Sequence, residues 1–586
     1  MPTQITNRIS QLVQISETRL LIVLSVVVGV ATALGAVGFI RLIEYFNSVF
    51  FGFTDQILVT AVGFADWGGY KVWLPLIPMI GGLLVGPIVY RYASEAKGHG
   101  VPEVMNSVAR LGGIIRPRVA VAKTIASAIC IGSGGSAGRE GPIVQIGSAL
   151  GSTVGQLFRM SGDRVKVLVG CGAAAGISAV FNAPIAGVIF SLEIILGDFS
   201  QRTFAPVIIS SVVASAVSHA FLGNHPAFAV PEYALVSPWE IPLYCLMGVA
   251  VGALAVAFTR TLDRFEDFFD DLRVANWTKP ALGGLLLGIL AIFFPQVLAD
   301  GYHTISLVLH GNMAVWLMVI LVLVKMVGTS LTLGSGNSGG IFAPSLFMGA
   351  VAGGAFGVLM NWLLPGSTAS PGAYALVGMA AMVAGTTHAP ITAMLIIFEM
   401  TGDYRIILPL MVAVVFASLV AGKLFSQSIY TAKLVKRGID IREGKDVSVL
   451  RSHRVREVMD TNFETIHAST SLLDIFRRIE HSHESYFVVE RADGRLKGVI
   501  SFQDIRNLLT QHDLDYLVIA QDLVAPDTAV LYTSDDLETA QRLFGLKGFV
   551  LLPVVDKNFP DRVVGVVRRE ELTDYYNRRL LETLRN

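Results

Sequence analysis

The sequence predicts an all-α polytopic membrane protein with interrupted helices and an internal repeat, followed by a small α/β domain. Hydrophobic residues make up 53% of the chain and charged residues only 15%, whereas soluble domains carry roughly 25% charged residues. Glycine- and proline-containing motifs occur twice in the apolar part. The charge is concentrated behind it, since residues 441–586 hold 44 of the 90 Lys, Arg, Asp and Glu residues.

The first apolar run, 20–40, is long enough to span a bilayer and follows a polar segment, 1–19, that we expect to be cytoplasmic. Further apolar runs lie at about 74–90, 118–132, 166–196, 205–221, 241–258, 281–294, 314–333, 341–363, 373–398 and 406–424. Several are short or cut by Gly or Pro. Interrupted helices are tolerated in a bilayer only where protein buries them or a cavity lies beside them. We therefore expect a transport domain over 20–437.

Two motif pairs indicate the repeat. GSGGSAGREGPIVQIG begins at Gly132 and GSGNSGGIFAPSLFMG begins at Gly334, with Gly, Ser, Gly, Ser, Gly, Pro and Gly in common. Later in each copy, an Ala-Pro-Ile triplet precedes a glutamate, Glu193 or Glu399, with nine residues from Pro to Glu. Transporters built from two repeated halves hold their substrate where interrupted helices of the halves meet. The sequence alone leaves open whether the second half is inverted.

The charged C-terminal part reads as two similar α/β modules behind a linker, 438–451. In the first, strands are expected at Tyr486–Val489 and Leu496–Ile500, with a turn at Asp493-Gly494. In the second, strands are expected at Phe549–Val555 and Val563–Val567 around a loop near Asn558, and a helix follows each pair. The cations Lys433, Lys436 and Arg437 follow the last apolar run and place this end in the cytoplasm.

Three glycine-rich segments, each with a proline early in the following helix, suggest how a small anion is held. They are Gly98–Pro102, Gly138–Pro142 and Gly340–Pro344. Backbone N–H groups at helix N-termini attract anions with a spread partial charge. A full fixed charge would hold the ion too tightly for release. Three unrelated helix kinks are the plainer alternative.

These motifs resemble the CLC family of chloride channels and chloride/proton exchangers. The resemblance runs from about residue 20 to 435 and rests on GREGP (138–142), FNAPIAGVIF (181–190), GGIFAP (339–344) and FEMTGDY (398–404). It implies an inverted repeat within each subunit and a homodimer with one pore per subunit.

The resemblance assigns roles to individual residues. Glu140 matches the gating glutamate, although a plain ion pair with Arg139 is the alternative. Tyr430 matches a tyrosine whose hydroxyl contacts the central ion, and otherwise reads as an interfacial anchor. Lys123 matches a buried lysine that sets a positive potential, and otherwise snorkels. The expected anion-binding residues are His99, Gly138, Arg139, Glu140, Ile341, Phe342 and Tyr430.

Two positions depart from the family pattern. His99 stands where most chloride-selective relatives have Ser. Its imidazole either donates to the ion and adds pH sensitivity, or points away. Ile194 stands where exchangers usually have the inner glutamate that passes protons, so proton coupling is doubtful.

The C-terminal part resembles a pair of CBS modules, at 452–511 and 523–580. Such pairs often bind adenine nucleotides (ATP, ADP or AMP), and Ser501 and Asp504 fit the ribose and phosphate motif. The second copy has Arg568 and Glu571 at the matching positions, so at most one ordinary nucleotide site is expected. A dimerisation module without ligand is an equal alternative.

The sequence therefore predicts a multi-pass protein of the plasma or inner membrane that conducts chloride, with both termini cytoplasmic. A proton/chloride antiporter, or a carrier of nitrate or fluoride, is the alternative within the family. A nucleotide sensor with a vestigial pore would show degraded pore motifs, and an organic or metal-ion transporter would show acidic clusters or aromatic pockets. No metal site, catalytic pairing, transport cofactor or nucleic-acid partner is expected.

Overall fold

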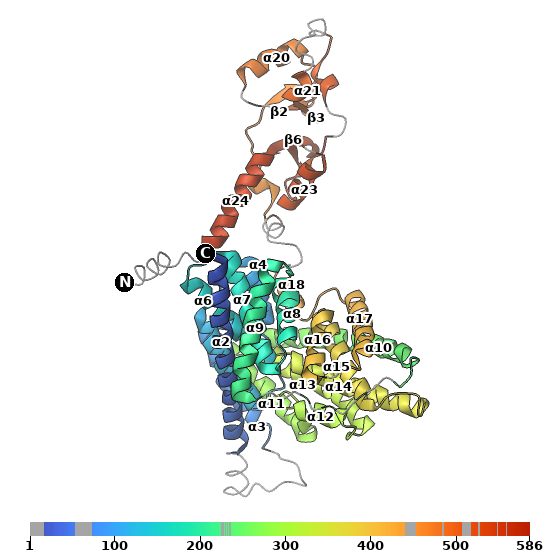
Figure 1. The fold of residues 1–586 in the computed structure, drawn as a ribbon. Helices are drawn as coiled ribbons and strands as arrows, with labels where there is room; N and C mark the ends of the chain where they lie inside the picture. The colour runs from blue at the N-terminus through green and yellow to red at the C-terminus, as the bar shows by residue number, and fades with distance from the viewer. Residues whose placement is uncertain are drawn as a thin grey trace, which may run out of the picture. The chain divides into compact units, whose positions relative to one another are not determined.

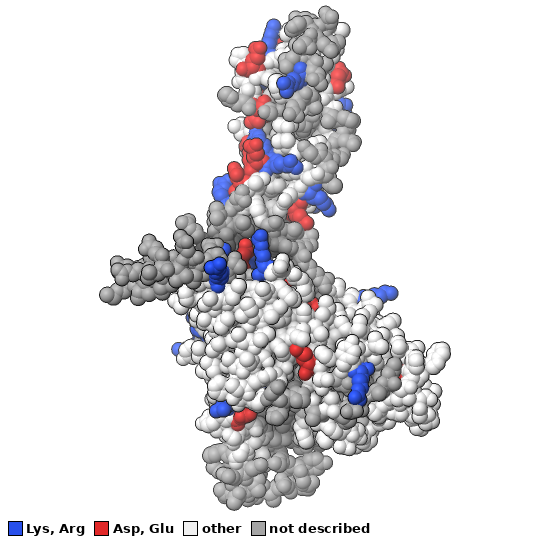
Figure 2. All heavy atoms as spheres, viewed as in Figure 1, with Lys and Arg blue, Asp and Glu red and all other residues white. Residues whose placement is uncertain are grey.

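The computed structural model describes residues 17–52, 73–223, 228, 230, 233, 236–402, 404–439, 450, 453–482, 484, 486–506, 517–524, 528–547, 549–557 and 559–585. The chain divides into two compact units, Met1–Ile439 and Asp440–Asn586. We call them the membrane unit and, after the location expected from the sequence, the cytosolic unit. On the face seen in Figure 2, charged side chains are sparse over the membrane unit and frequent over the cytosolic unit.

The membrane unit consists of helices in its described part (Figure 1). They are α2 (Glu17–Asn47), α3 (Leu76–Pro87), α4 (Val101–Arg110), α5 (Pro117–Gly132), α6 (Glu140–Leu157), α7 (Gly162–Phe181), α8 (Pro184–Phe190), α9 (Gln201–Leu222), α10 (Glu240–Asp271), α11 (Lys279–Phe293), α12 (Tyr302–Leu309), α13 (Val315–Gly334), α14 (Phe342–Leu363), α15 (Pro371–Thr387), α16 (Pro390–Thr401), α17 (Ile407–Leu424) and α18 (Thr431–Lys436). The π-helical segments η1 (Ser48–Gly52), η3 (Ile88–Tyr92) and η5 (Ser191–Leu196) extend α2, α3 and α8.

Eight helices of the described residues are long and apolar enough to cross a membrane. The helices α4, α8, α12 and α16 are too short to do so alone, with 10, 7, 8 and 12 residues. A span needs about 20 residues. The predicted fold class, a polytopic helical membrane protein with interrupted helices, is confirmed.

The repeat is visible in the packing of the core. Helix α6 packs on α7, and its repeat counterpart α14 packs on α15. In the first pair, a β carbon on Gly147 or Gly172 would overlap the carbonyl oxygen of the other glycine. Gly349 and Gly378 stand in the same relation in the second pair. Glycine at these positions lets the two backbones of each pair approach closely, as is common between membrane helices.

The cytosolic unit contains two three-stranded sheets of the same topology. They are β1 (Thr465–His467), β2 (Tyr486–Glu490) and β3 (Leu496–Ser501), and β4 (Leu531–Tyr532), β5 (Leu551–Asp556) and β6 (Phe559–Arg568). In each sheet the first strand is parallel and the third antiparallel to the middle strand. The remaining helices are α20 (Leu472–His481), α21 (Phe502–Arg506), α22 (Ala520–Leu523), α23 (Leu537–Lys547) and α24 (Arg569–Arg585).

The expected order of strands and helices in the cytosolic unit is confirmed, with shifted boundaries. In the second module β5 begins at Leu551 rather than Phe549, and β6 begins at Phe559 rather than Val563. The earlier start of β6 follows from its pairing, since Phe559 lies opposite Asp556. Gly494 takes the expected turn conformation with a φ of 75°, and Asn558 lies outside the described residues.

Candidate functional site

The two copies of the repeat motif meet in the middle of the membrane unit. Gly138 N donates to Gly340 O at 2.8 Å, and Gly340 N donates to Gly138 O at 2.6 Å, which forms an antiparallel bridge. The loop before α4 joins them, because Gly98 N donates to Asn337 O at 3.0 Å and Gly98 O accepts from Gly339 N at 3.3 Å. The three predicted segments are therefore brought together. The amide of Gly138 is used in the bridge and is not free for an anion here.

Three helices begin at this junction. Gly100 precedes α4 with a φ of 82°, Arg139 precedes α6, and Ile341 precedes α14. Each helix end presents N–H groups without acceptors inside the helix and the positive end of the helix dipole. At Gly100, a β carbon would stand 2.7 Å from Gln145 Oε1 in a strained backbone conformation, so glycine is needed there. The arrangement favours a small negative group.

Glu140 supplies such a group at the junction. It is the first residue of α6 and only 1% exposed. Its Oε1 accepts a hydrogen bond from the Tyr302 hydroxyl at 2.7 Å. Its Oε2 accepts no hydrogen bond from any described residue and lies beside the bridge, 3.3 Å from where a β carbon on Gly340 would stand. The alternative of an ion pair with Arg139 is not what the structure shows, since no such pair is present among the described residues.

Tyr302, at the first position of α12, was not predicted from the sequence. Its ring contacts Phe228 edge-on at 5.2 Å between centroids, and the Arg139 guanidinium lies 5.1 Å from its centroid. No motif near residue 302 signals this contact, because it joins residues 162 positions apart. Glycine at 301 was the only local sign, since its φ of 80° allows the turn into α12.

His99 and Tyr430 lie close together, each 2% exposed, with 5.7 Å between their ring centroids. The Nδ1 atom of His99 is buried and has no hydrogen-bond partner in the described part of the chain. His99 also lies on a narrow crevice that is open to solvent. The crevice is lined by His99, Thr259, Leu262, Asp263, Glu266, Ile429, Ala432 and Lys433. The imidazole thus faces a polar opening from a buried position.

Lys123 is fully buried rather than snorkelling. Its Nζ donates to Ala96 O at 3.1 Å and to Gly98 O at 2.6 Å. Lys325 was not predicted, although it stands nine residues before Gly334 just as Lys123 stands nine residues before Gly132. Both are 0% exposed. The shared offset was the signal in the sequence that could have found Lys325.

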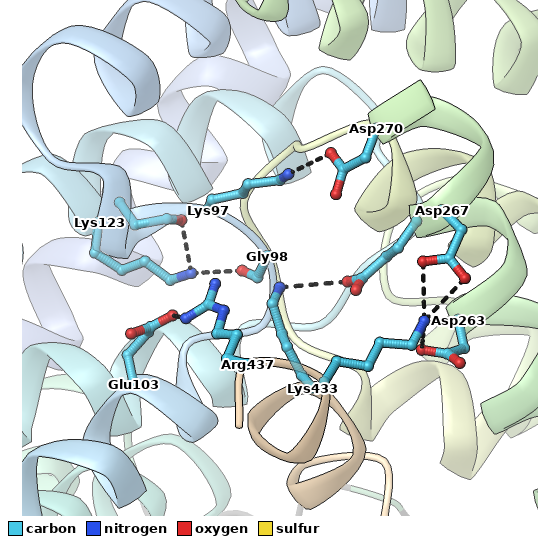
Figure 3. A network of polar contacts seen from close by, with 12 residues as sticks. Lys97, Gly98, Glu103, Lys123, Asp263, Asp267, Asp270, Lys433 and Arg437 are labelled. Atoms are coloured by element: carbon cyan, nitrogen blue, oxygen red, sulfur yellow. Dashed lines mark hydrogen bonds and ion pairs between the residues drawn. The ribbon is translucent and has the colours of Figure 1, made fainter. Parts of the chain in front are cut away.

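Ion pairs surround the crevice near His99 and tie α18 to α10 and α4 (Figure 3). They are Lys97–Asp270 (2.9 Å), Lys433–Glu266 (3.3 Å), Lys436–Asp263 (2.6 Å), Lys436–Asp267 (2.9 Å) and Arg437–Glu103 (2.6 Å). Figure 3 shows the Lys123 side chain beside this network, pointing to the carbonyl of Gly98. The network fixes α18, which begins directly after Tyr430.

Ile194 is buried in η5, at 8% exposure. Its neighbour Glu193 accepts hydrogen bonds from Thr392 N at 2.7 Å and Thr392 Oγ1 at 2.6 Å. This carboxylate is therefore occupied with the first turn of α16. It is not placed to stand in for the missing acid at Ile194.

In the cytosolic unit, Ser501 ends β3 and Asp504 lies in α21, but the Asp504 side chain lies outside the described residues. Arg568 ends β6 at the matching place. Its guanidinium pairs with Asp460 and Glu571 at 2.7 and 2.8 Å, and with Glu484 at 2.8 Å. Hydrogen bonding to Arg568 lowers the pKa of Asp460. Arg568 thus occupies the position that matches the candidate nucleotide site of the first module, and ion pairs within the unit hold it there.

Comparison with known proteins gives consistent matches. The family model described as voltage gated chloride channel matches residues 81–422, and a CBS domain model matches 455–511. A ClcB-like chloride channel protein of Ralstonia nicotianae is 35% identical, over 70% of this chain and 96% of its own. The H(+)/Cl(-) exchange transporter ClcA of Vibrio campbellii is 35% identical, over 62% and 80%. A solved slow cyanobacterial Cl-/H+ antiporter is 26% identical with a TM-score of 0.65, over 72% of this chain and 98% of its own.

Proposed function

The chain belongs to the voltage gated chloride channel family, and from this premise we propose that it carries chloride across a membrane along a path gated by Glu140. It is a multi-pass membrane transport protein, not an enzyme. The observation that carries the proposal is the buried carboxylate at the junction of three helix N-termini. A buried carboxylate in a membrane protein is costly and functional by default.

The geometry explains how such a gate works. The Glu140 carboxylate is itself an anion, so it satisfies the electropositive junction when no other anion is there. When it is protonated or displaced, the same N–H groups are left for chloride. Because these donors carry only partial charge, they bind the ion without trapping it. Tyr430 and the amides of Ile341 and Phe342 are proposed as further donors.

We propose that proton coupling is weak or absent. Support comes from Ile194, which is buried and cannot titrate, and from Glu193, whose carboxylate caps α16. Proton-coupled exchange is the second candidate. It is favoured by relatives named as H(+)/Cl(-) exchange transporters and by the carboxylate retained at Glu140.

The proposal also covers the assembly of subunits, the side of the membrane on which the termini lie, and the ligand of the cytosolic unit. The protein is a homodimer with one path in each subunit, as the family resemblance implies. Lys433, Lys436 and Arg437 support a cytoplasmic position for the C-terminal end, and the N-terminal segment is proposed to lie on the same side. Adenine nucleotide binds at Ser501 and Asp504. In the second module, Arg568 occupies the matching position and forms ion pairs with carboxylates of the same unit, so no nucleotide binds there.

The test is chloride flux from liposomes loaded with the purified protein, recorded at external pH values from 4 to 8. Glu140→Gln is a neutral mimic of the protonated gate and should flatten the dependence of flux on external pH. Glu44→Gln changes an exposed glutamate of α2 and is the matched control. A Glu140→Gln variant that keeps the wild-type pH profile would show that another group is the gate.

A further inference from the structure

The Glu140 carboxylate marks a place that suits a small anion. It is negative and buried, and its Oε2 lies beside the bridge between Gly138 and Gly340 at the start of α6. On the proposed function, chloride takes this place once the carboxylate has left. A group that donates a hydrogen bond to the carboxylate oxygen is then directed at the anion that replaces it.

The one side-chain donor that reaches this carboxylate among the described residues is the Tyr302 hydroxyl, at 2.7 Å from Oε1. A phenol donates strongly to anions and is neutral. It therefore contributes affinity without a fixed charge that would hinder release. Hydrogen bonds to a charged partner are among the stronger ones in proteins.

The Tyr302 ring is held by contacts that do not involve Glu140. Phe228 packs against it edge-on at 5.2 Å, and the Arg139 guanidinium lies 5.1 Å from the ring centroid. These contacts fix the plane of the ring and the direction of its hydroxyl. The donor therefore stays in place when the Glu140 side chain moves away.

Lys325 holds the loop that leads into Tyr302. Its Nζ donates to Val297 O at 3.0 Å and to Ala299 O at 2.8 Å. From the other side, Ala299 N donates to Gly134 O at 3.1 Å. The loop between the two anchors and Tyr302 is only Asp300 and Gly301 long, so it has little freedom.

The same arrangement, a buried lysine that donates to two loop carbonyls, occurs in the first half of the molecule. Lys123, at the same offset before the repeat motif, donates to the carbonyls of Ala96 and Gly98 just before His99 and α4. Each buried lysine therefore fixes a loop that ends in a polar side chain near the junction. In this register Asp300 matches His99, and Tyr302, the first residue of α12, matches Val101, the first residue of α4.

We propose that the Tyr302 hydroxyl is a ligand of the transported anion. It donates its hydrogen bond to the Glu140 carboxylate when the carboxylate is in place, and to chloride when chloride replaces the carboxylate. Lys325 is the positioning residue for Tyr302. The inference rests on the proposed function, because it requires that an anion occupies the place of the carboxylate. It adds a second phenol donor to the Tyr430 hydroxyl and the backbone amides already proposed.

The decisive experiment removes the carboxylate first. Chloride binding to the purified full-length Glu140→Ala protein is measured by calorimetry in detergent, with and without Tyr302→Phe. If Tyr302 binds the anion, Tyr302→Phe weakens chloride binding about 10-fold, as loss of one hydrogen bond to a charged group implies. Equal affinities would show that Tyr302 serves only the carboxylate and would overturn the proposal. Chloride flux through Glu140→Ala liposomes tests the proposed function separately.

A matched control removes a different buried phenol. Tyr233 donates to Leu309 O at 2.6 Å, so Tyr233→Phe loses a hydrogen bond of the same kind elsewhere and should leave chloride affinity unchanged. Equal loss in both tyrosine variants would attribute the effect to general destabilisation and would overturn the assignment. Elution of each variant as a single symmetrical size-exclusion peak verifies its folding.

The role of Lys325 is tested by additivity. In the Glu140→Ala background, Lys325→Met should weaken chloride binding to the extent that Tyr302→Phe does, and the combination should weaken it no further. Lys325→Arg keeps the donors and should restore binding at least in part. Independent, multiplicative losses would show that Lys325 does not act through Tyr302 and would overturn this part. If Lys325→Met does not fold, Lys325→Gln replaces it in the same additivity test, with the same two outcomes.

Discussion

Glu193 and Glu399 each cap the short helix to which the other belongs. The Glu193 carboxylate accepts from Ile391 N at 3.3 Å and from Thr392 N at 2.7 Å, in the first turn of α16. The Glu399 carboxylate, on α16, accepts from Ala186 N at 2.6 Å in the first turn of α8. The exchange relates the two halves of the repeat by a two-fold axis, and it uses orphan N–H groups that these helix ends leave.

Neutralising either cap should destabilise the membrane unit. Glu193→Gln or Glu399→Gln replaces a charged acceptor at two helix N–H groups with a neutral one, at a cost of about 1–2 kcal/mol. Thermal unfolding of the detergent-solubilised protein should show a lower Tm for both variants and no change for Glu44→Gln. A wild-type Tm in both cap variants would mean that water or lipid replaces these bonds without loss.

The sequence predicts much of this arrangement and misses a specific part. The nine-residue spacing from Pro to Glu in both copies already places a carboxylate at equivalent ends of two helices, and the glycine motifs predict the junction around Glu140. The partner of each carboxylate was not predictable. Glu193 contacts Thr392, and Glu140 contacts Tyr302, across 199 and 162 positions. Such contacts depend on how the two halves close on each other, which no local pattern records.

Replacing His99 should change which anions pass. Its buried Nδ1 has no hydrogen-bond partner among the residues that the structure describes, and its ring lies 5.7 Å from that of Tyr430. His99→Ser exchanges a bulky aromatic donor for a small hydroxyl and should shift the permeability ratios among chloride, nitrate and fluoride by several-fold. Ratios are measured from reversal potentials in planar bilayers at pH 5 to 8.

The control is His310→Ser, which changes an exposed histidine bonded to the Ser306 carbonyl. It should leave both the ratios and their pH dependence unchanged. Identical ratios and an identical pH profile in wild type and His99→Ser would place the imidazole outside the anion path.

Adenine nucleotide should bind once per cytosolic unit. Ser501 ends β3, whereas at the matching end of β6 Arg568 is occupied by Asp460, Glu484 and Glu571. Calorimetry with ATP, ADP and AMP should give one site, and Asp504→Ala should weaken it by about 10-fold or more, since unpaired buried polar groups cost roughly 1–3 kcal/mol. Absence of heat with all three nucleotides, or binding unaffected by Asp504→Ala, would refute this.

The Arg568 cluster should stabilise the cytosolic unit at neutral pH and lose this contribution in acid. The pKa of Asp460 is lowered, chiefly by its hydrogen bond from Arg568. A lowered folded-state pKa gives stability that is present above the unfolded value of about 3.9 and is lost as the pH falls through the folded value. Arg568→Gln should therefore destabilise the unit by about 1 kcal/mol at pH 7, since the cluster is partly exposed to solvent, and by less below pH 4.

Thermal unfolding of residues 440–586 between pH 3 and 7 measures this dependence. Arg495→Gln removes an exposed ion pair with Asp493 and serves as the control, because such pairs contribute little. A loss of stability in Arg568→Gln that stays constant from pH 3 to 7 would contradict the electrostatic explanation.

Proton coupling should be weak because no titratable group stands at residue 194. The Ile194 side chain is buried and apolar, and the adjacent Glu193 is held at the start of α16 by two bonds from Thr392. A chloride gradient imposed across liposomes at equal pH should therefore drive no sustained proton movement. Sustained uphill proton movement at a fixed ratio to chloride would make the protein an exchanger.

A gain-of-function variant tests whether the missing carboxylate at residue 194 is the cause of weak proton coupling. Ile194→Glu places a carboxylate where the proton path lacks one and should increase proton movement driven by chloride. Ile194→Gln has nearly the same shape and polarity but does not titrate, so it should leave coupling at the wild-type level. If Ile194→Gln raises coupling as much as Ile194→Glu, then water admitted by a polar side chain carries the proton. If neither variant raises it, the barrier to protons lies elsewhere between the cytosolic surface and Glu140.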